Sequence, residues 1–142
     1  MAKAMNILWG VKMSKEFKSL VGRTLKNIVL EESAHTGKIE AVFFETTDGF
    51  TYAMRHSQDC CEHVYLEDIC GDLEDLLGSQ ITQADMVQST ESVSRELEEQ
   101  DRSYLWTFYK LATVKGYVTL RWFGSSNGYY SEGVDFEIVE QP

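Results

Sequence analysis

The C-terminal third of this chain places β-branched and aromatic residues in near alternation, and this two-residue period is the feature that most restricts its fold. Three runs carry the pattern: SYLWTFYKLATV, GYVTLRWFG and YYSEGVDFEIVE. Successive side chains of a strand point to opposite faces of a sheet, so the alternation predicts strands. Gly116 separates the first two runs, and GSSNG at 124–128 predicts a hairpin loop because Asn and Gly tolerate left-handed backbone. We therefore predict antiparallel strands here.

The first half of the chain also indicates strands. The run LKNIVLEE precedes KIEAVFFETTDGFTYAMRH, which contains Asp48 and Gly49, a dipeptide that strongly favours a hairpin turn. Strands are therefore expected between residues 24 and 56. The pattern changes between Glu62 and Leu77, where apolar residues are spaced mainly by three and four, which predicts short helical turns. These apolar residues are Val64, Leu66, Ile69, Leu73, Leu76 and Leu77.

Together these patterns predict an α+β fold, in which early and late strands form one antiparallel sheet with short helices between them. Residues 81–93 are interpreted as a strand edge followed by a polar loop, and residues 88–102 as an acidic loop or insertion. The 142 residues are near the commonest size of one domain, and no linker divides them. We expect a single domain over residues 1–142.

Two further features bear on where the protein works. The longest uninterrupted apolar stretches, such as residues 28–30 and 41–44, are far shorter than the roughly 20 residues of a membrane-spanning helix. The N-terminal segment has scattered lysines and no apolar core before a small-residue cleavage site, which argues against a secretory signal. A soluble intracellular protein is expected. The odd trio Cys60, Cys61 and Cys70 then favours reduced thiols over a disulfide framework.

The formal net charge is −10, but the acidity is regional. Residues 59–101 hold thirteen acidic residues and one basic residue, Arg95, so the rest of the chain has a net charge of +2. A long nucleic acid would be repelled by the acidic segment, whereas a small anionic ligand would find neutral or basic surface elsewhere. The charge pattern therefore argues against a nucleic-acid polymer as partner.

The segment MRHSQDCCEHVYLEDICGD concentrates the cysteines and two histidines among acids. A structural zinc site needs four converging ligands, usually from paired Cys-x2-Cys knuckles. Cys60 and Cys61 are adjacent, so in an extended segment they point to opposite faces. One set of ligands can still be assembled, with a spacing that fits no knuckle: His56, Cys60, His63 and Cys70. We predict no metal site.

A catalytic cysteine is not favoured either. It needs a base and an electropositive setting, whereas Asp59 and Glu62 beside the cysteines would disfavour a thiolate. The simpler interpretation is that the cysteines pack as small apolar side chains under the sheet, with Arg55 or His56 free to face a ligand. The common phosphate-loop, dinucleotide, nucleophile-elbow and His-Glu-x-x-His motifs do not occur. The sequence thus predicts neither an enzyme nor a cofactor.

Aromatic and basic residues gather between Trp106 and Tyr130, where the chain has eight aromatic and three basic residues. Rings stack on nucleobases and arginine pairs with phosphate, so this combination suits a nucleotide pocket, although the core of a sheet has a similar composition. In GYVTLRWFG, Tyr117 and Arg121 share a mixed face, which is the candidate site. The opposite face, predicted to be core, carries Val118, Leu120 and Trp122.

Other residues of this region have two interpretations. Asn127 either holds the turn or offers its amide to a base or ribose edge. Tyr129 and Tyr130 point to opposite faces, so at most one of them joins the mixed face. The full set of predicted ligand-binding residues is Arg55, His56, Phe108, Tyr117, Arg121, Trp122, Asn127 and Tyr129.

Two blocks of sequence, DCCEHVYLEDICGDLEDLLGS and WTFYKLATVKGYVTLRWFGSSNGYYSEGVDF, resemble a widespread family of small bacteriophage proteins over roughly residues 20–136. The organisation also resembles the anti-Thoeris sponge proteins of phages. Those proteins are oligomers that bind cyclic ADP-ribose-type signals at subunit interfaces and silence bacterial immunity without consuming the ligand. The resemblance implies a pocket in the KGYVTLRWFGSSNGYY block together with Arg55.

The leading hypothesis is therefore a non-enzymatic phage protein, in the cytoplasm of the infected host, that sequesters a cyclic nucleotide as a homo-oligomer. In this hypothesis Tyr117 or Trp122 stacks on the base, Arg121 and Arg55 pair with phosphates, and Asn127 binds a polar edge. Two alternatives stay open: an acidic protein that inhibits a host enzyme by imitating nucleic acid, and a nucleotide hydrolase.

Overall fold

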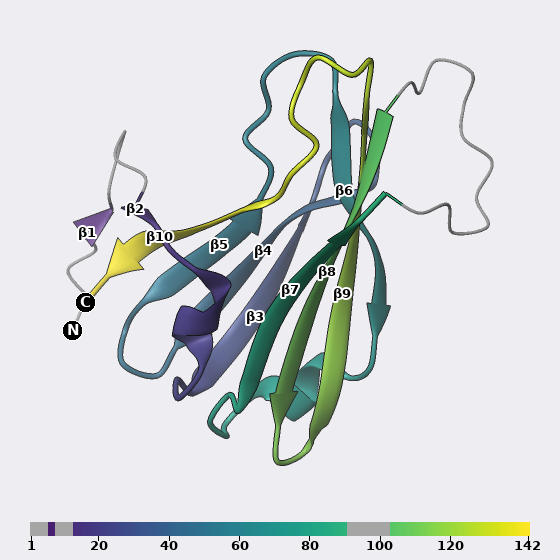
Figure 1. Cartoon of the computed structure of the whole chain (residues 1–142). Coiled ribbons are helices and arrows are strands. Elements are labelled where there is room, and N and C mark those ends of the chain that lie inside the picture. The colour runs from purple at the N-terminus through teal and green to yellow at the C-terminus, as the bar shows by residue number, and fades with distance from the viewer. Residues whose placement is uncertain (1–5, 8–12, 91–102) are drawn as a thin grey trace.

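The structure, a computed structural model, describes residues 6–7, 13–90 and 103–142 and forms a curled antiparallel half-barrel (Figure 1). The strand order is β1-β10-β5-β4-β6-β9-β8-β7, with β2 beside β10 and β3 beside β4. The strands are β1 (Asn6–Ile7), β2 (Met13–Ser14), β3 (Leu25–Glu32), β4 (Ile39–Thr46), β5 (Thr51–Arg55), β6 (His63–Cys70), β7 (Gln83–Ser89), β8 (Ser103–Thr113), β9 (Gly116–Ser126) and β10 (Asp135–Gln141). Two four-residue 3-10 turns are the helical part of the described chain: η1 (Phe17–Leu20) and η2 (Leu73–Leu76).

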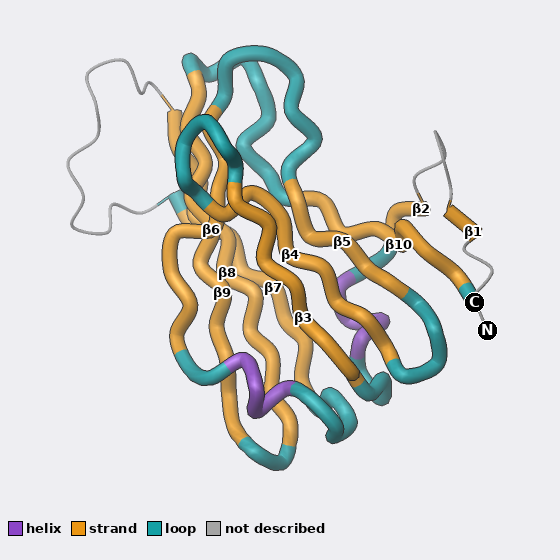
Figure 2. Tube along the Cα trace, turned by 180° about the vertical axis from the view of Figure 1, so that it is seen from behind, coloured by secondary structure: helices purple, strands orange, loops and turns teal. Residues whose placement is uncertain are grey.

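The curled sheet has two walls that face each other (Figure 2). The first wall contains β3, β4, β5 and β10, and the second contains β6, β9, β8 and β7. A single paired position, Ile39 with Leu66, joins β4 to β6 between the walls. The turn η1 links them elsewhere, because the ring of Phe17 lies 4.6 Å from that of Tyr109 on β8 and 5.3 Å from that of Phe136 on β10.

The hydrophobic core lies between the walls and follows the two-residue period of the strands. The second wall contributes Val118, Leu120 and Trp122, each at most 1% exposed, so the prediction that this face of β9 is core is confirmed. The indole Nε1 of Trp122 donates to Sδ of Met54 on β5, at 3.1 Å. The core therefore fills the space between the walls.

The predicted α+β class is wrong, because strands dominate the described residues and their helical part is limited to the two short turns. The error came from residues 62–77, which were predicted to form helical turns. Half of this segment is strand β6, where Val64 and Leu66 point into the core with the period of a strand. The helical spacing is correct only for η2. Asp72 is the N-cap of this turn, and its side chain accepts a hydrogen bond from the amide of Glu74. Pairing with β9 decided the conformation of β6.

The predicted turns had different outcomes. The hairpin at Asp48 and Gly49 is confirmed: β4 pairs with β5, and Gly49 adopts a φ of +96°. The hairpin predicted at residues 124–128 is wrong, because β9 continues to Ser126 and the next strand, β10, crosses to the first wall and pairs with β5. The predicted association of early and late strands in one sheet is confirmed by this pairing.

Two further predictions concern the acidic segment 88–102 and membrane-spanning helices. In the predicted acidic segment 88–102, Gln88 and Ser89 are the last residues of β7, and residues 91–102 lie outside the described residues. No helix within the described ranges has the length and apolar character needed to cross a membrane.

Candidate functional site

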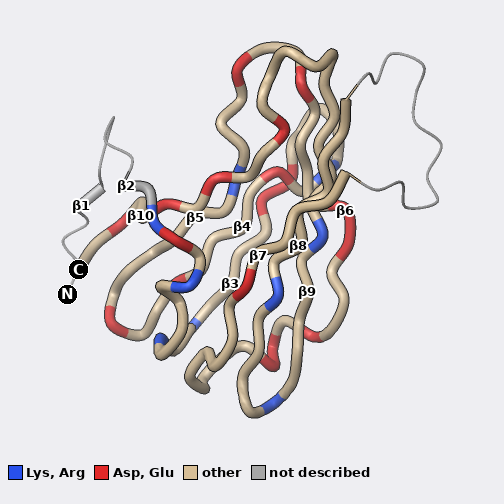
Figure 3. Tube along the Cα trace, in the orientation of Figure 1, with Lys and Arg blue, Asp and Glu red and all other residues tan. Residues whose placement is uncertain are grey.

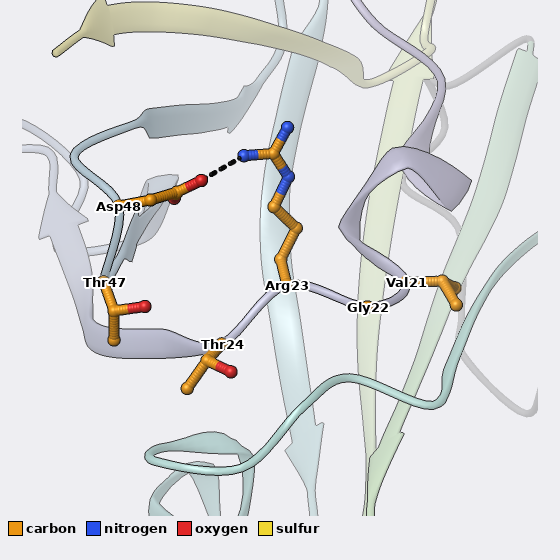
Figure 4. Close-up of a pocket in the computed structure, with 6 residues that line it drawn as sticks. All are labelled: Val21, Gly22, Arg23, Thr24, Thr47 and Asp48. Carbon is orange, nitrogen blue, oxygen red and sulfur yellow. Dashed lines mark hydrogen bonds and ion pairs between the residues drawn. The ribbon is translucent and has the colours of Figure 1, made fainter.

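A polar pocket of about 410 Å³ opens where the chain leaves η1 and enters β3, next to the β4–β5 turn (Figure 4). We call it the Arg23 pocket; its lining residues are Val21, Gly22, Arg23, Thr24, Thr47 and Asp48. Backbone hydrogen bonds fix its walls: the amide of Gly22 donates to the carbonyl of Ile81, and the amide of Thr47 donates to the carbonyl of Thr24, at 2.8 and 2.9 Å. The lining is therefore held by the sheet and by the Ile81 segment.

The central interaction of the pocket joins Arg23 and Asp48. Nη1 of Arg23 donates to Oδ2 of Asp48 at 2.8 Å, and the guanidinium lies 4.6 Å from the centre of the Phe50 ring. The hydroxyl of Thr46 donates to the other carboxylate oxygen of Asp48. This hydrogen bond, with the charge of Arg23, lowers the pKa of Asp48 below its ordinary value despite partial burial. Asp48 is therefore a carboxylate and a weak base at neutral pH.

The pocket still has hydrogen-bonding groups to offer a ligand. Within the described chain, Nε and Nη2 of Arg23 have no hydrogen-bond partner, and neither have the hydroxyls of Thr24 and Thr47. Arginine pairs with phosphate through more than one N–H group, and hydroxyls add single hydrogen bonds. Gly22 leaves open space, since a Cβ built there meets nothing within 4 Å. The arrangement suits a compact ligand with an anionic group and hydroxyl groups.

The residues predicted from the late strands do not line this pocket. Trp122 is sealed in the core, so its ring is not available to stack on a base. Arg121 lies on the outer face of the second wall, where its Nη2 is 3.3 Å from Oε1 of Glu67 and its guanidinium covers the ring of Trp106 at 5.4 Å. Phe108 is paired opposite Arg121 on the same face. Arg121 and Phe108 therefore lie on the outer face of the second wall, and Trp122 lies on its core face.

Three further predicted residues are exposed around the second wall. Tyr117 is 77% exposed near the start of β9, and Tyr129 is 84% exposed beyond its end. The side-chain oxygen of Asn127 accepts a hydrogen bond from the amide of Tyr129 at 3.0 Å, which is the turn-holding role considered for it. Tyr129 also contacts the ring of Tyr130 edge to face. The structure does not bring these side chains together.

Arg55 and His56 each hold a carboxylate of the protein, Arg55 with its side chain 39% exposed and His56 with its side chain 5% exposed. Nε and Nη2 of Arg55 both donate to Oε1 of Glu137, at 3.0 and 2.9 Å. Nε2 of His56 lies 2.8 Å from Oε1 of Glu62, and its Nδ1 lies 2.6 Å from the carbonyl oxygen of Gly133. Neither of the two pockets described for this chain is lined by any of the eight predicted residues.

The cysteines also differ from expectation. Cys60 and Cys61 form a disulfide with each other, and both are exposed, so they neither point to opposite faces nor pack under the sheet as reduced thiols. Cys70 is an exposed free thiol, and a hydrogen bond to Asp68, with partial burial, raises its pKa. Among the described residues no group of three or more His, Cys, Asp or Glu side chains is placed to hold a metal ion.

The comparison with protein families gives one result. The model of a domain of unknown function, DUF7448, matches residues 18–136. The chain belongs to the DUF7448 family. The matched range of this DUF7448 protein includes both the Arg23 pocket and the Cys60–Cys61 disulfide. No curated protein and no solved structure gives a significant match.

Sequence reasoning missed the functional groups of the Arg23 pocket. Arg23 and Asp48 are 25 residues apart; the sequence pattern marks Asp48 only as part of a hairpin turn and gives Arg23 no role. Neither position carries a motif that indicates a ligand. The β3–β4 pairing and the β4–β5 turn bring them together, so no local signal was present to find them.

Proposed function

We propose that this DUF7448 protein is a non-enzymatic binding protein that holds a small phosphorylated ligand in the Arg23 pocket. The observation that carries the proposal is the set of donors that have no partner in the described chain, on Arg23, Thr24 and Thr47, around one open pocket. The pocket volume of about 410 Å³ lies in the range of small-molecule sites, which is roughly 300–1,000 Å³.

The chemistry of the pocket favours binding over turnover. Asp48 is its carboxylate, and the lowered pKa makes it a poor proton acceptor at neutral pH. The six lining residues include no His or Cys to act as base or nucleophile. A ligand held there keeps its bonds intact, as a protein that sequesters a signal requires.

A cyclic nucleotide of the cyclic ADP-ribose type fits the two halves of the site. Its phosphates match the guanidinium of Arg23, and its ribose hydroxyls match the carboxylate of Asp48, which accepts hydrogen bonds. The resemblance to phage sponge proteins selects this ligand from the wider class of phosphorylated molecules. In this proposal the protein acts in the cytoplasm of an infected bacterium, as a homo-oligomer whose second copy covers the open mouth of the pocket.

Isothermal titration of the full chain with cyclic ADP-ribose isomers and cyclic dinucleotides tests the proposal. We expect one of these ligands to bind and to be recovered chemically intact after the protein is denatured. Arg23→Gln should weaken its binding. Arg121→Gln is the matched control, since it removes an arginine of the outer face. Absence of binding to all of these ligands at high micromolar concentration contradicts the proposal, as does equal weakening by both substitutions.

A second candidate is inhibition of a host nucleic-acid-binding enzyme by surface mimicry. Exposed acids lie on β6 and at the turn η2: Glu67, Asp68, Asp72 and Glu74. Figure 3 shows acidic positions along β6. Such a surface would compete for a basic cleft. Reversing the charge of Glu67, Asp72 and Glu74 separates the two candidates, because it abolishes mimicry and leaves ligand binding at Arg23 unchanged. Glu96, Glu98 and Glu99, which belong to the same acidic stretch of sequence, lie outside the described residues.

A further inference from the structure

The loop between β5 and β6, residues 56–62, carries the Cys60–Cys61 disulfide at the end of β5 opposite to the Arg23 pocket (Figure 1). Both cysteines are exposed to solvent. Two cysteines that are adjacent in the chain stay close in either oxidation state, so they can re-form their bond without any search by the chain. Accessibility and proximity, the two requirements of a reversible disulfide, are both met here.

The loop around the cysteines is organised by a buried carboxylate. The side chain of Glu62 is fully buried and accepts hydrogen bonds from the amides of Asp59 and Cys60 and from Nε2 of His56. The side-chain amide of Gln58 donates to the carbonyl oxygens of Cys60 and Glu62, at 3.1 and 2.8 Å. Both backbone polar groups of Cys60 are therefore held, and no cysteine sulfur takes part in this anchor.

The anchor also ties the loop to the rest of the fold. Nδ1 of His56 meets the carbonyl oxygen of Gly133 in the connection between β9 and β10, at 2.6 Å. These bonds use backbone groups and the side chains of His56, Gln58 and Glu62, so none of them depends on a sulfur atom. The loop can therefore keep the two sulfurs in the same place when their oxidation state changes.

We propose that Cys60 and Cys61 form a thiol–disulfide exchange site whose co-reactants are low-molecular-weight thiols and disulfides. The thiolate of a small thiol attacks one of the two sulfurs, the Cys60–Cys61 bond breaks, and the other cysteine leaves as a thiolate that takes up a proton. A second small thiol attacks the mixed disulfide and releases the small-molecule disulfide. Two electrons and two protons thereby pass from two small thiols to the protein, and the reverse sequence restores the bond.

Cys70 gives the protein an internal reference for this chemistry. It lies at the far end of β6, about 23 Å along the strand from His63 at a rise of roughly 3.3 Å per residue. It therefore cannot bridge to Cys60 or Cys61 within the folded chain. Cys70, which has no disulfide partner, stays open to alkylation or forms a mixed disulfide with a small thiol, whereas Cys60 and Cys61 form a disulfide with each other.

Differential alkylation of the native full-length protein, equilibrated with reduced and oxidised glutathione at a series of ratios, tests the proposal. Peptide mass spectrometry reads the Cys60–Cys61 peptide separately from the Cys70 peptide. We expect the former to change from no label to two labels as the buffer becomes reducing, with no singly labelled form at equilibrium. The Cys60→Ser variant should instead carry glutathione on Cys61 in oxidising buffer.

Several results would overturn the proposal. Two labels on the Cys60–Cys61 peptide in oxidised glutathione would mean that the bond does not form, and no label in reduced glutathione before denaturation would mean that it does not exchange. Near-ultraviolet circular dichroism gives the independent readout: we expect the spectrum to be retained on reduction, because the anchor uses no sulfur. Collapse of the spectrum would show a purely structural disulfide.

Discussion

Two pairs of a carboxylate and a nitrogen-bearing side chain, Asp48 with Arg23 and Glu62 with His56, lie at the two ends of β5, and they differ in burial. In the Arg23 pocket, Nη1 of Arg23 is 2.8 Å from Asp48, and the two side chains are 31% and 56% exposed. In the loop between β5 and β6, Nε2 of His56 is 2.8 Å from Oε1 of Glu62, and the side chains are 5% and 0% exposed. The distances are the same, yet one pair faces solvent with hydrogen-bonding capacity left, whereas the other is enclosed.

The enclosed pair is satisfied by its surroundings. Both ring nitrogens of His56 have partners, Nδ1 at the carbonyl oxygen of Gly133 and Nε2 at Oε1 of Glu62. Burial acts to raise the pKa of Glu62, but hydrogen bonds from His56 and from the amides of Asp59 and Cys60 outweigh it and lower the pKa to about 2. The comparison teaches that burial assigns the roles: the buried pair organises a loop, and the exposed pair remains available to a ligand.

The largest expected effect comes from breaking the buried pair. Glu62→Gln should lower the free energy of unfolding by ~3–5 kcal/mol, because it leaves His56 enclosed without its anionic partner. Urea unfolding followed by fluorescence measures this change. Glu67→Gln is the matched control, since it breaks the partly exposed pair with Arg121 and should cost about 1 kcal/mol or less. Similar losses in the two variants would remove the distinction drawn from burial.

Acid should reveal the same pair in the unmodified protein. Glu62 has an ordinary pKa of 4.5, and the folded protein lowers it to about 2. The stability that its charge contributes is complete above about pH 4.5 and is lost as the pH falls towards 2, since the unfolded chain takes up the proton first. Thermal unfolding measured across this interval should show a steeper decline for the wild type than for Glu62→Gln. Parallel declines would mean that Glu62 does not contribute.

The exposed pair should affect binding more than stability. Arg23→Gln should weaken the binding of a phosphorylated ligand by ~1.5–3 kcal/mol, at least tenfold in affinity, because it removes hydrogen bonds to a charged group. The free energy of unfolding should change by about 1 kcal/mol or less, as for other exposed ion pairs. Titration calorimetry and urea unfolding of the same variant check the two halves. Loss of stability without loss of binding would reverse the roles assigned to the two ends of β5.

The smallest effect is expected at the hydroxyl groups. Thr47→Val keeps the shape of the side chain and removes one neutral hydrogen bond to the ligand, which should weaken binding by ~0.5–1.5 kcal/mol. Thr36→Val is the control, because Thr36 lies in the exposed turn between β3 and β4, away from the pocket. Calorimetry resolves such a change if the unmodified protein binds in the micromolar range, and equal behaviour of the two variants would exclude Thr47 from the site.

The positions of the strands follow from the sequence, whereas the pairing of each strand with its neighbours in the sheet does not. Alternation predicts β8 and β9 and the inward face of β9 with Trp122, and Asp48 with Gly49 predicts the turn between β4 and β5. The same reasoning misread β6, because apolar residues spaced by three and four also suit a strand that continues into a 3-10 turn. It also paired β10 with β9, since a short glycine-rich loop does not specify which strand comes next to it.

The candidate site shows the same division. Tyr117 and Arg121 of β9 share an outer face, as the period requires, whereas Trp122 lies on the core face. A face is not a cavity, and Arg121 lies against Glu67 and Trp106. The Arg23 pocket joins two turns that are distant in sequence, and each turn alone resembles an ordinary surface loop.

The sequence by itself determined which segments are extended and which side of each strand is apolar, because both depend on neighbours one or two residues apart. Only the tertiary structure decided the order of the strands, the crossing of β10 to the first wall, and the burial that makes Glu62 an anchor and leaves Asp48 in an open pocket. The physical reason is that solvation and electrostatics depend on what packs against a side chain, and in this curled sheet those contacts come from residues far away in the chain.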